Sequence, residues 1–366
     1  MDFNFSEEQL AVRDLAAQIF SGRVDAERIK AIEASDDRID RDLWTELAKA
    51  NLLGIALDEA HGGSGLGLTA LCLVLQEQGR RLAPVPLITV ALGALPLQQF
   101  GTPELAGDWL PRIVEGQATI TAALDEADAI DPAAPRVRLE NGALHGTKLA
   151  VPAGRVADRV LVPAATDDGV TVFVVDPRSP GVTIEPIDTT DHQAAAHLIF
   201  DAATPETVLG KPGDGAAVVN WILDRAQVAL AAIQLGVAQE ALRLVAEYTS
   251  ERFQFGKPLS TFQGVSLRAA DAYIDTTAMD VTLWQAAWRI DEGLDASQEV
   301  AIAKWWAAEG GQRVVYATQH LHGGMGADVD YPIHRYFLWG KQIADSLGGA
   351  SRQLARLGAQ IADAYR

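Results

Sequence analysis

Two long helical patterns in the second half of the chain constrain its fold more than any other feature. Apolar residues recur at helical intervals through residues 216–250, and a second helical pattern begins near Gln263. Gly256 and Pro258 separate the two patterns, because glycine costs backbone entropy in a helix and proline lacks an N–H donor and clashes with the preceding turn. The sequence therefore predicts a helix, a break and a second helix.

The break carries side chains that suit a phosphorylated ligand. Arg252 offers a planar fork of donors that matches a diphosphate, and the carboxamide of Gln263 can bind the polar edge of a ring. Three phenylalanines, Phe253, Phe255 and Phe262, lie between them. The alternative from residue types alone is an ordinary helical corner with a surface arginine, since a corner needs only a breaker and polar residues.

The periodicity changes along the chain from helix to strand and back to helix. Residues 1–115 show helical patterns, residues 116–209 show short strands separated by turns such as Asn141-Gly142, and residues 210–366 are helical again. The 366 residues are enough for two or three domains. We expect a mainly α protein with a central antiparallel β domain, divided at these boundaries.

Composition excludes several classes of function. A formal net charge of −19, without a basic stripe, argues against a nucleic-acid surface. The single cysteine, Cys72, rules out an intrachain disulfide and suits a reducing compartment. The segment 1–5 lacks the features of an export signal, and no apolar run appears long enough to span a bilayer, so we expect a cytoplasmic protein without membrane contact. His320 and His322 have no evident third ligand, so we expect no metal.

Two motifs resemble those of the acyl-CoA dehydrogenase family. The first is Arg252-x-x-Phe255-Gly-x-Pro-Leu with Phe262 and Gln263, and the second is the Gln-x-x-x-Gly-Gly-x-Gly loop that starts at Gln319. The resemblance covers essentially the whole chain and implies an α-β-α fold with a C-terminal four-helix bundle. It also implies FAD as cofactor, with these motifs contacting the adenosine diphosphate half of an FAD that belongs to the neighbouring subunit. The implied contacts are Arg252, Gln254, Phe255, Phe262, Gln263, Gln319, Gly323 and Gly324.

The resemblance also shows where a catalytic base is missing. Family enzymes remove the α-proton of an acyl thioester with a glutamate that occupies one of two positions, and these positions hold Leu347 and Ala226 here. Neither side chain accepts a proton, so no catalytic residue is assigned. Asp345 and Asp224 lie nearby as fallback bases, although two residues along a helix point to a different face.

Residues that contact the flavin ring in the family are missing from this chain too. The first strand of the sheet leads into the loop from Asp125 to Pro132, which lacks the family's Gly-Ser. After Gly-x-Lys, the family's Trp-Ile-Thr/Ser is absent: Ala150 replaces the tryptophan, and Pro152 has neither a hydroxyl nor an N–H to donate.

These losses suggest a non-catalytic partner subunit. The resemblance is to the non-catalytic subunit of heteromeric, steroid-catabolism-type acyl-CoA dehydrogenases of actinobacteria, which implies a homologous catalytic subunit in a heterotetramer. It further implies an acyl-CoA substrate and an electron-transfer flavoprotein as acceptor. Two alternatives stay open: a homomeric flavin and CoA enzyme with a displaced base, and a catalytically inactive structural or regulatory homologue.

Overall fold

The structure is a computed structural model that describes residues 4–127 and 129–364. Residues 1–3, part of the segment that lacks an export signal, and Asp128, in the loop without Gly-Ser, lie outside this description. The chain forms two compact units. One contains the segment ending at Ile29, Leu68–Ala83 and the segment from Gln227 onwards; the other contains Lys30–Gly67 and Pro84–Ala226.

The second unit is built around one eight-stranded sheet with the order β6-β7-β3-β2-β4-β5-β8, and β1 pairs with β4. The β1–β4 and β2–β4 pairs are parallel and the others are antiparallel, so the sheet is mixed rather than the purely antiparallel one expected from the hairpin turns. The strands are β1 Ile120–Ala122, β2 Arg138–Glu140, β3 Ala143–Val151, β4 Arg159–Thr166, β5 Gly169–Val175, β6 Val182–Pro186, β7 Ala196–Ala203 and β8 Thr207–Leu209.

The turn between β2 and β3 has the conformation that its sequence predicts. Asn141 and Gly142 have φ values of 51° and 81°, as in the type I′ turns that join two-residue hairpins. Side chains such as Val160, Phe173 and Leu198 fill the core of the sheet. Helical elements complete this unit: η1 Glu59–His61, α3 Arg41–Lys49, the π-helical turn η2 Val90–Ala94, α5 Leu95–Phe100 and α6 Pro103–Val114.

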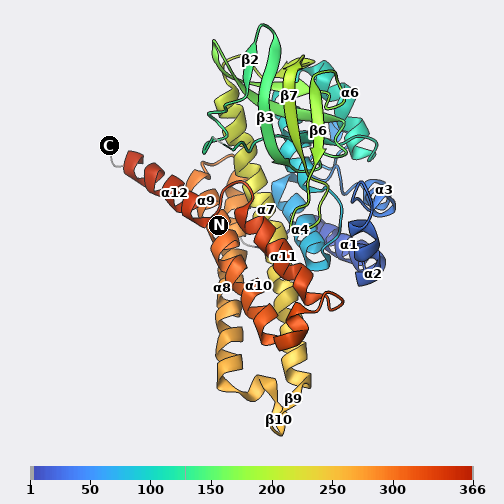
Figure 1. Ribbon diagram of the computed structural model, residues 1–366, viewed down its shortest axis with the longest axis vertical. Coiled ribbons are helices and arrows are strands. Elements are labelled where there is room, and N and C mark those ends of the chain that lie inside the picture. Colours follow the sequence, from blue (N-terminus) through green and yellow to red (C-terminus); the bar gives the residue numbers. More distant parts are fainter. Residues whose placement is uncertain (1–3, 128, 365–366) are drawn as a thin grey trace. The chain divides into compact units, whose positions relative to one another are not determined.

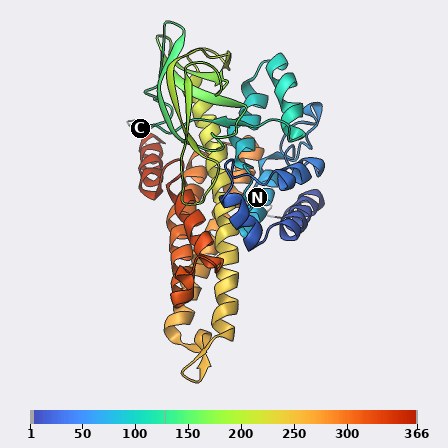
Figure 2. The same ribbon diagram turned by 45° about the vertical axis from the view of Figure 1, so that its right-hand side comes forward.

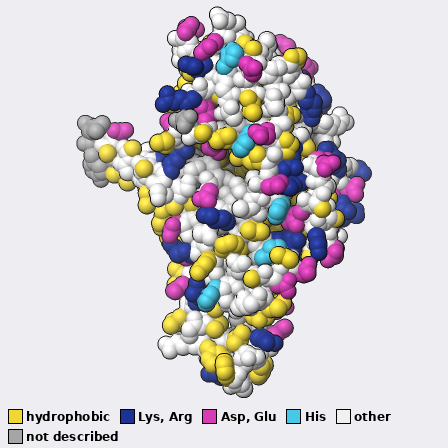
Figure 3. All heavy atoms as spheres, viewed as in Figure 1, with side chains coloured by type: hydrophobic (Ala, Val, Ile, Leu, Met, Phe, Trp, Pro, Cys, Tyr) yellow, Lys and Arg dark blue, Asp and Glu magenta, His cyan; other side chains and the backbone are white. Residues whose placement is uncertain are grey.

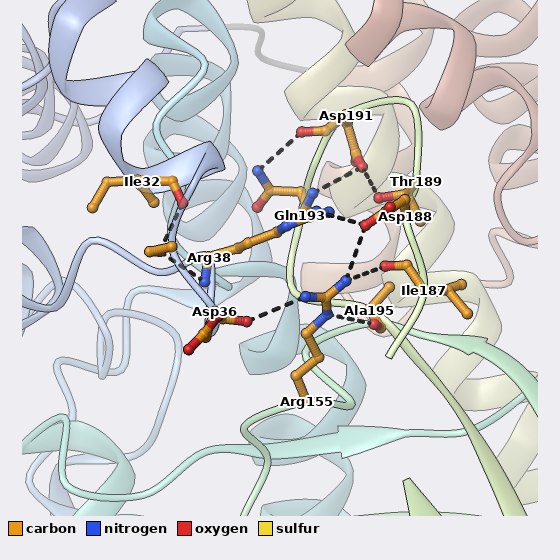
Figure 4. A network of polar contacts seen from close by, with 11 residues as sticks. Ile32, Asp36, Arg38, Arg155, Ile187, Asp188, Thr189, Asp191, Gln193 and Ala195 are labelled. Carbon is orange, nitrogen blue, oxygen red and sulfur yellow. Dashed lines mark hydrogen bonds and ion pairs between the residues drawn. The ribbon is translucent and has the colours of Figure 1, made fainter. Parts of the chain in front are cut away.

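A network of arginine contacts fixes the long loop between β6 and β7 (Figure 4). The guanidinium of Arg155 donates to the carbonyls of Ala195 at 3.0 Å and Asp36 at 3.2 Å, and lies 3.3 Å from the carboxylate of Asp188. Arg38 donates to the same carboxylate at 2.5 Å. The segment after α2 (Ala26–Glu33) is therefore tied to the sheet's loop within one unit.

In the first unit, α1 (Glu7–Arg23) begins with a capping box, in which Ser6 and Gln9 bond each other's backbone. Helix α4 (Gly67–Arg81) crosses α7 (Gly215–Glu251) at very short range. A Cβ on Gly79 would lie 2.1 Å from the carbonyl oxygen of Ile233, and one on Gly236 would lie 1.9 Å from that of Gln76. Glycine is required at both positions because any side chain would push the helices apart.

The C-terminal helices form the expected bundle (Figures 1 and 2). Helix α8 packs against α9 and α10, α10 packs against α11, and α12 packs against α9. The last part of the helical region 210–366 forms two helices, α11 and α12, which Gly348 (φ 92°) and its neighbours separate. The elements are α8 Gln263–Asp291, α9 Ser297–Trp305, the π-helical turn η4 Trp306–Gly310, α10 Gly311–Leu321, α11 Ile333–Asp345 and α12 Ala350–Ala364.

Contrary to the expectation that no apolar run is long enough, helix α7 is, among the described residues, one helix that is long and apolar enough to cross a membrane. However, 78% of its most apolar window is buried inside the protein. Its apolar residues are therefore explained by packing, and α7 is a core helix of the fold.

Candidate functional site

The predicted break between the two long helices is a β-hairpin. Strands β9 (Phe253–Gln254) and β10 (Lys257–Pro258) pair antiparallel at the end of α7 and α8, as Figures 1 and 2 show. Phe255 and Gly256, the two residues of the turn, have φ values of 53° and 79°. A positive φ at a phenylalanine is uncommon and strained, and such conformations persist where the surrounding structure or a function retains them.

The polar side chains of the hairpin are exposed and available. Arg252 and Gln263 are both exposed. Neither side chain has a hydrogen-bond or ion-pair partner within residues 4–127 and 129–364. The carboxamide nitrogen of Gln254 donates to the neighbouring carbonyl of Phe253 at 2.8 Å, which leaves its oxygen free to accept. The hairpin thus offers an unpaired guanidinium and two carboxamides to a ligand or a partner.

Aromatic contacts stiffen the hairpin. Phe255, 91% exposed, packs edge-to-face against Phe262 with ring centroids 6.2 Å apart. The Lys257 ammonium lies 4.3 Å from the centre of the Phe262 ring, within the range of a cation–π contact. Figure 3 shows apolar side chains gathered over this end of the bundle. Phe262 supports the turn, whereas Phe255 is presented outward.

The second motif folds into a tight turn, η5 (Gly323–Ala327), at the end of α10. The side-chain amide nitrogen of Gln319 donates one N–H to the carbonyl of Gly326 at 2.8 Å, so Gln319 holds the loop and keeps its second N–H and its oxygen for a ligand. A Cβ on Gly326 would lie 2.2 Å from the carbonyl oxygen of Gln319, whereas a Cβ on Gly323 or Gly324 would meet nothing in the described chain. Packing within the chain therefore explains Gly326 but not the exposed pair.

An aromatic stack joins the two motifs. The imidazole of His322, directly before the glycine loop, lies parallel to the ring of Tyr248 with centroids 4.6 Å apart. Its other neighbour is Tyr331, 5.4 Å away. The carbonyl of Tyr248 accepts the N–H of Arg252 at 2.9 Å. The end of α7 and the glycine loop thus form one continuous surface within the same unit.

Leu347, the position at which the resemblance places the family's downstream glutamate, lies in the loop between α11 and α12. Leu347 is 8% exposed, with a left-handed φ of 52°. Its carbonyl accepts from the amide nitrogens of Gln227 at 3.1 Å and Gln353 at 3.4 Å. The loop geometry is thus held in place around an apolar side chain. The alternative base position, Ala226, is fully buried in α7.

The surroundings of Asp345, one of the two fallback carboxylates, differ from those of a general base. Asp345 is 65% exposed in this chain and pairs with Lys341 at 3.0 Å, an i,i+4 surface ion pair rather than a dry pocket. Asp224 lies two residues before Ala226 on α7, about 200° around the helix, and so on a different face. The surroundings of Asp345 therefore do not support it as a base. The side chain of Asp224 leaves α7 on a different face from that of Ala226.

The β-domain positions that hold a flavin ring in the family are occupied by groups without suitable donors. Ala150 has a left-handed φ of 44° at an irregularity in β3, and its N–H is already used by Nδ1 of His197 at 3.0 Å. Pro152 follows. The loop after β1 is fixed by a buried ion pair of 2.5 Å between Glu126 and Lys148. Neither Ala150 nor Pro152 carries a hydroxyl.

The two halves of an FAD therefore fit this chain differently. An adenosine diphosphate needs cationic donors and closely approachable backbone, which Arg252 and the open glycines Gly323 and Gly324 supply. A flavin ring needs donors on the sheet, and Ala150 and Pro152 supply none. The residues fit the first half of the cofactor and not the second.

Comparisons with known proteins agree with this architecture. Residues 6–117 match the N-terminal domain and residues 213–360 the C-terminal domain of acyl-CoA dehydrogenases. The acyl-CoA dehydrogenase FadE27 of Mycobacterium tuberculosis is 38% identical over 99% of both chains.

Solved structures extend the likeness to the fold. A variant of the Tcur3481-Tcur3483 steroid ACAD is 49% identical with a TM-score of 0.93, over 98% of this chain and 99% of that one. The ChsE4-ChsE5 complex from Mycobacterium tuberculosis has the same TM-score at 38% identity, over 99% of both chains. Butyryl-CoA dehydrogenase from Megasphaera elsdenii has a TM-score of 0.90 at 28% identity, over 99% of this chain and all of that one. The chain belongs to the acyl-CoA dehydrogenase family, whose members are FAD-dependent oxidoreductases acting on CH–CH bonds.

Proposed function

We propose that this chain is the non-catalytic subunit of a heteromeric acyl-CoA dehydrogenase. It holds the adenosine diphosphate half of an FAD whose ring, base and acyl pocket belong to a homologous catalytic subunit. The observation that carries the proposal is an asymmetry: the hairpin arginine is exposed and unpaired in the described chain, while both base positions hold apolar side chains.

The binding surface combines the hairpin and the glycine loop. Arg252 contributes a positive charge and paired donors to the diphosphate. Gln254, Phe255, Phe262 and Gln263 surround it on the hairpin. Gly323 and Gly324 allow the ligand to approach the backbone, and Gln319 supports that loop through its bond to Gly326.

The relatives support a heteromer and suggest its substrate class. Two similar structures are described as a steroid ACAD with two named components and as a complex of two different chains. We infer by similarity an acyl-CoA thioester with a steroid skeleton as substrate, a heterotetramer as the assembly and the cytoplasm as the location. FAD bound at this site would supply the acceptor for the hydride that leaves the β-carbon, and we propose an electron-transfer flavoprotein as the oxidant of the reduced flavin.

The experiment is co-expression with a homologous subunit that carries the glutamate, followed by measurement of flavin per complex. Arg252→Ala is expected to lower FAD affinity at least tenfold, on the order of the loss of one charge-assisted contact. Arg81→Ala, at an exposed arginine in the last turn of α4, is the matched control and should change little. Unchanged flavin occupancy in Arg252→Ala, with the complex intact, would contradict the proposal.

A further inference from the structure

The histidine between the two motifs has an unusual environment. His322 is 1% exposed, and the rings of Tyr248 and Tyr331 contact it. Tyr248 stands one turn before the hairpin arginine on α7, and Tyr331 follows the glycine loop. His322 thus packs between one element that leads into the hairpin and one that leaves the loop.

The hydrogen bonds of His322 define its tautomer. Nδ1 lies 2.7 Å from the carbonyl oxygen of Thr318, which can only accept, so Nδ1 carries the proton. Nε2 is buried and has no partner among the described residues. A second proton on Nε2 would place an unpaired positive charge inside the protein, which is costly. Burial accordingly lowers the pKa of His322, and the ring is neutral.

Alternative ligand roles for this histidine are not supported. Its neighbour His320 is exposed, and no group of three or more metal-ligating side chains occurs within residues 4–127 and 129–364. A neutral, fully packed ring with one fixed hydrogen bond is suited to holding structure rather than to binding a metal or transferring a proton.

From this geometry we propose that His322 is a positioning residue for the proposed FAD-binding surface formed by Arg252, Gly323 and Gly324. Its ring locks the last turn of α7 and the turn Gly323–Ala327 into one rigid platform, so that Arg252 and the open glycines are held ready before the ligand arrives. Preorganisation of this kind raises affinity because less freedom is lost on binding. The inference rests on the proposed function, since it assigns His322 a role in the same site.

Two substitutions separate the ring from its hydrogen bond. His322→Leu removes the aromatic contacts, and His322→Phe keeps them while losing the bond to Thr318. In the complex reconstituted with the glutamate-bearing subunit, we expect His322→Leu to raise the FAD dissociation constant about five- to tenfold, the effect of one or two aromatic contacts. His322→Phe should stay within about threefold of the parent chain.

The chain offers a matched control. His320 stacks on Tyr316 of the same helix with centroids 6.5 Å apart, whereas the ring that stacks on Tyr248 of α7 is that of His322. His320→Leu should therefore leave FAD affinity unchanged. If His322→Leu does not fold, as judged by its thermal melting curve, Tyr331→Leu weakens the same stack from its partly exposed side and should show the same loss of affinity.

A double variant distinguishes positioning from general stability. If His322 acts through the arginine, the effect of His322→Leu should largely disappear in the Arg252→Ala background, because coupled residues are not additive. Full additivity, or an unchanged dissociation constant in both His322→Leu and Tyr331→Leu while Arg252→Ala weakens binding, would overturn the inference. An unchanged constant in Arg252→Ala itself would instead overturn the proposed function.

Discussion

Removing Glu126 or Lys148 from their buried ion pair should lower the free energy of unfolding by different amounts. Their side chains are 4% and 0% exposed. Glu126 also accepts the backbone N–H groups of Arg136 at 2.6 Å and Val137 at 3.3 Å, so its charge is stabilised three times. Lys148 has no hydrogen-bond partner but Glu126 among the described residues, and burial lowers its pKa.

The expected costs follow from what each substitution leaves behind. Glu126→Ala strands a buried ammonium and should cost about 3–5 kcal/mol of unfolding free energy. Lys148→Met keeps the apolar stem and leaves a carboxylate with two N–H donors, so its cost should be about 2 kcal/mol. The double variant removes the stranded charge and should be more stable than Glu126→Ala alone.

The assay is urea unfolding, combined with hydrogen exchange at the amides of β3 and β4, which report on this sheet. Lys341→Met, at the exposed pair with Asp345, is the control and should cost less than about 0.5 kcal/mol. Raising the pH should stabilise Glu126→Ala, because the stranded lysine loses its proton more easily folded than unfolded. A double variant less stable than Glu126→Ala, or a greater loss in Lys148→Met than in Glu126→Ala, would refute this reasoning.

Three further predictions concern the site. Leu347→Glu should give the chain alone no dehydrogenase activity with acyl-CoAs and an artificial acceptor, because the ring contacts are missing as well; measurable turnover would count against the account. Gly326→Ala should lower the melting temperature because its Cβ meets the Gln319 carbonyl, whereas Gly324→Ala should leave melting unchanged and reduce flavin content. His322 has a lowered pKa, so the unfolded chain binds a proton more readily and stability should fall as the pH drops through about 6.5; His322→Phe should show a smaller slope in urea titrations.

Periodicity and breakers were sufficient to predict most of the architecture. The change of period locates the sheet between helical segments, and Asn141-Gly142 predicts a hairpin because both residues tolerate positive φ. The parallel partners of β4 could not be predicted, since sequence patterns do not say which distant strands pair. The short elements α2 and β8 carry too few residues for a clear pattern.

The site was predictable only in part. Gly256 and Pro258 predict that the helix ends, but not that Phe255 adopts a left-handed turn to form a hairpin. The motif predicts Gln319 as a ligand residue, but it does not predict the bond that its side-chain amide makes to Gly326 inside the loop. From the sequence, His322 suggests only a metal ligand. Its ring partners Tyr248 and Tyr331 lie more than 70 residues before it and 9 residues after it, and they contact it only in the folded chain.

The most direct test of an FAD shared between this chain and a catalytic subunit is to measure the flavin content of this chain purified alone and of the co-expressed complex. We expect one FAD for each pair of unlike subunits in the co-expressed complex, little flavin in this chain purified alone, and loss of flavin from the complex when this chain carries Arg252→Ala. A flavin-replete, active homotetramer of this chain alone would contradict it.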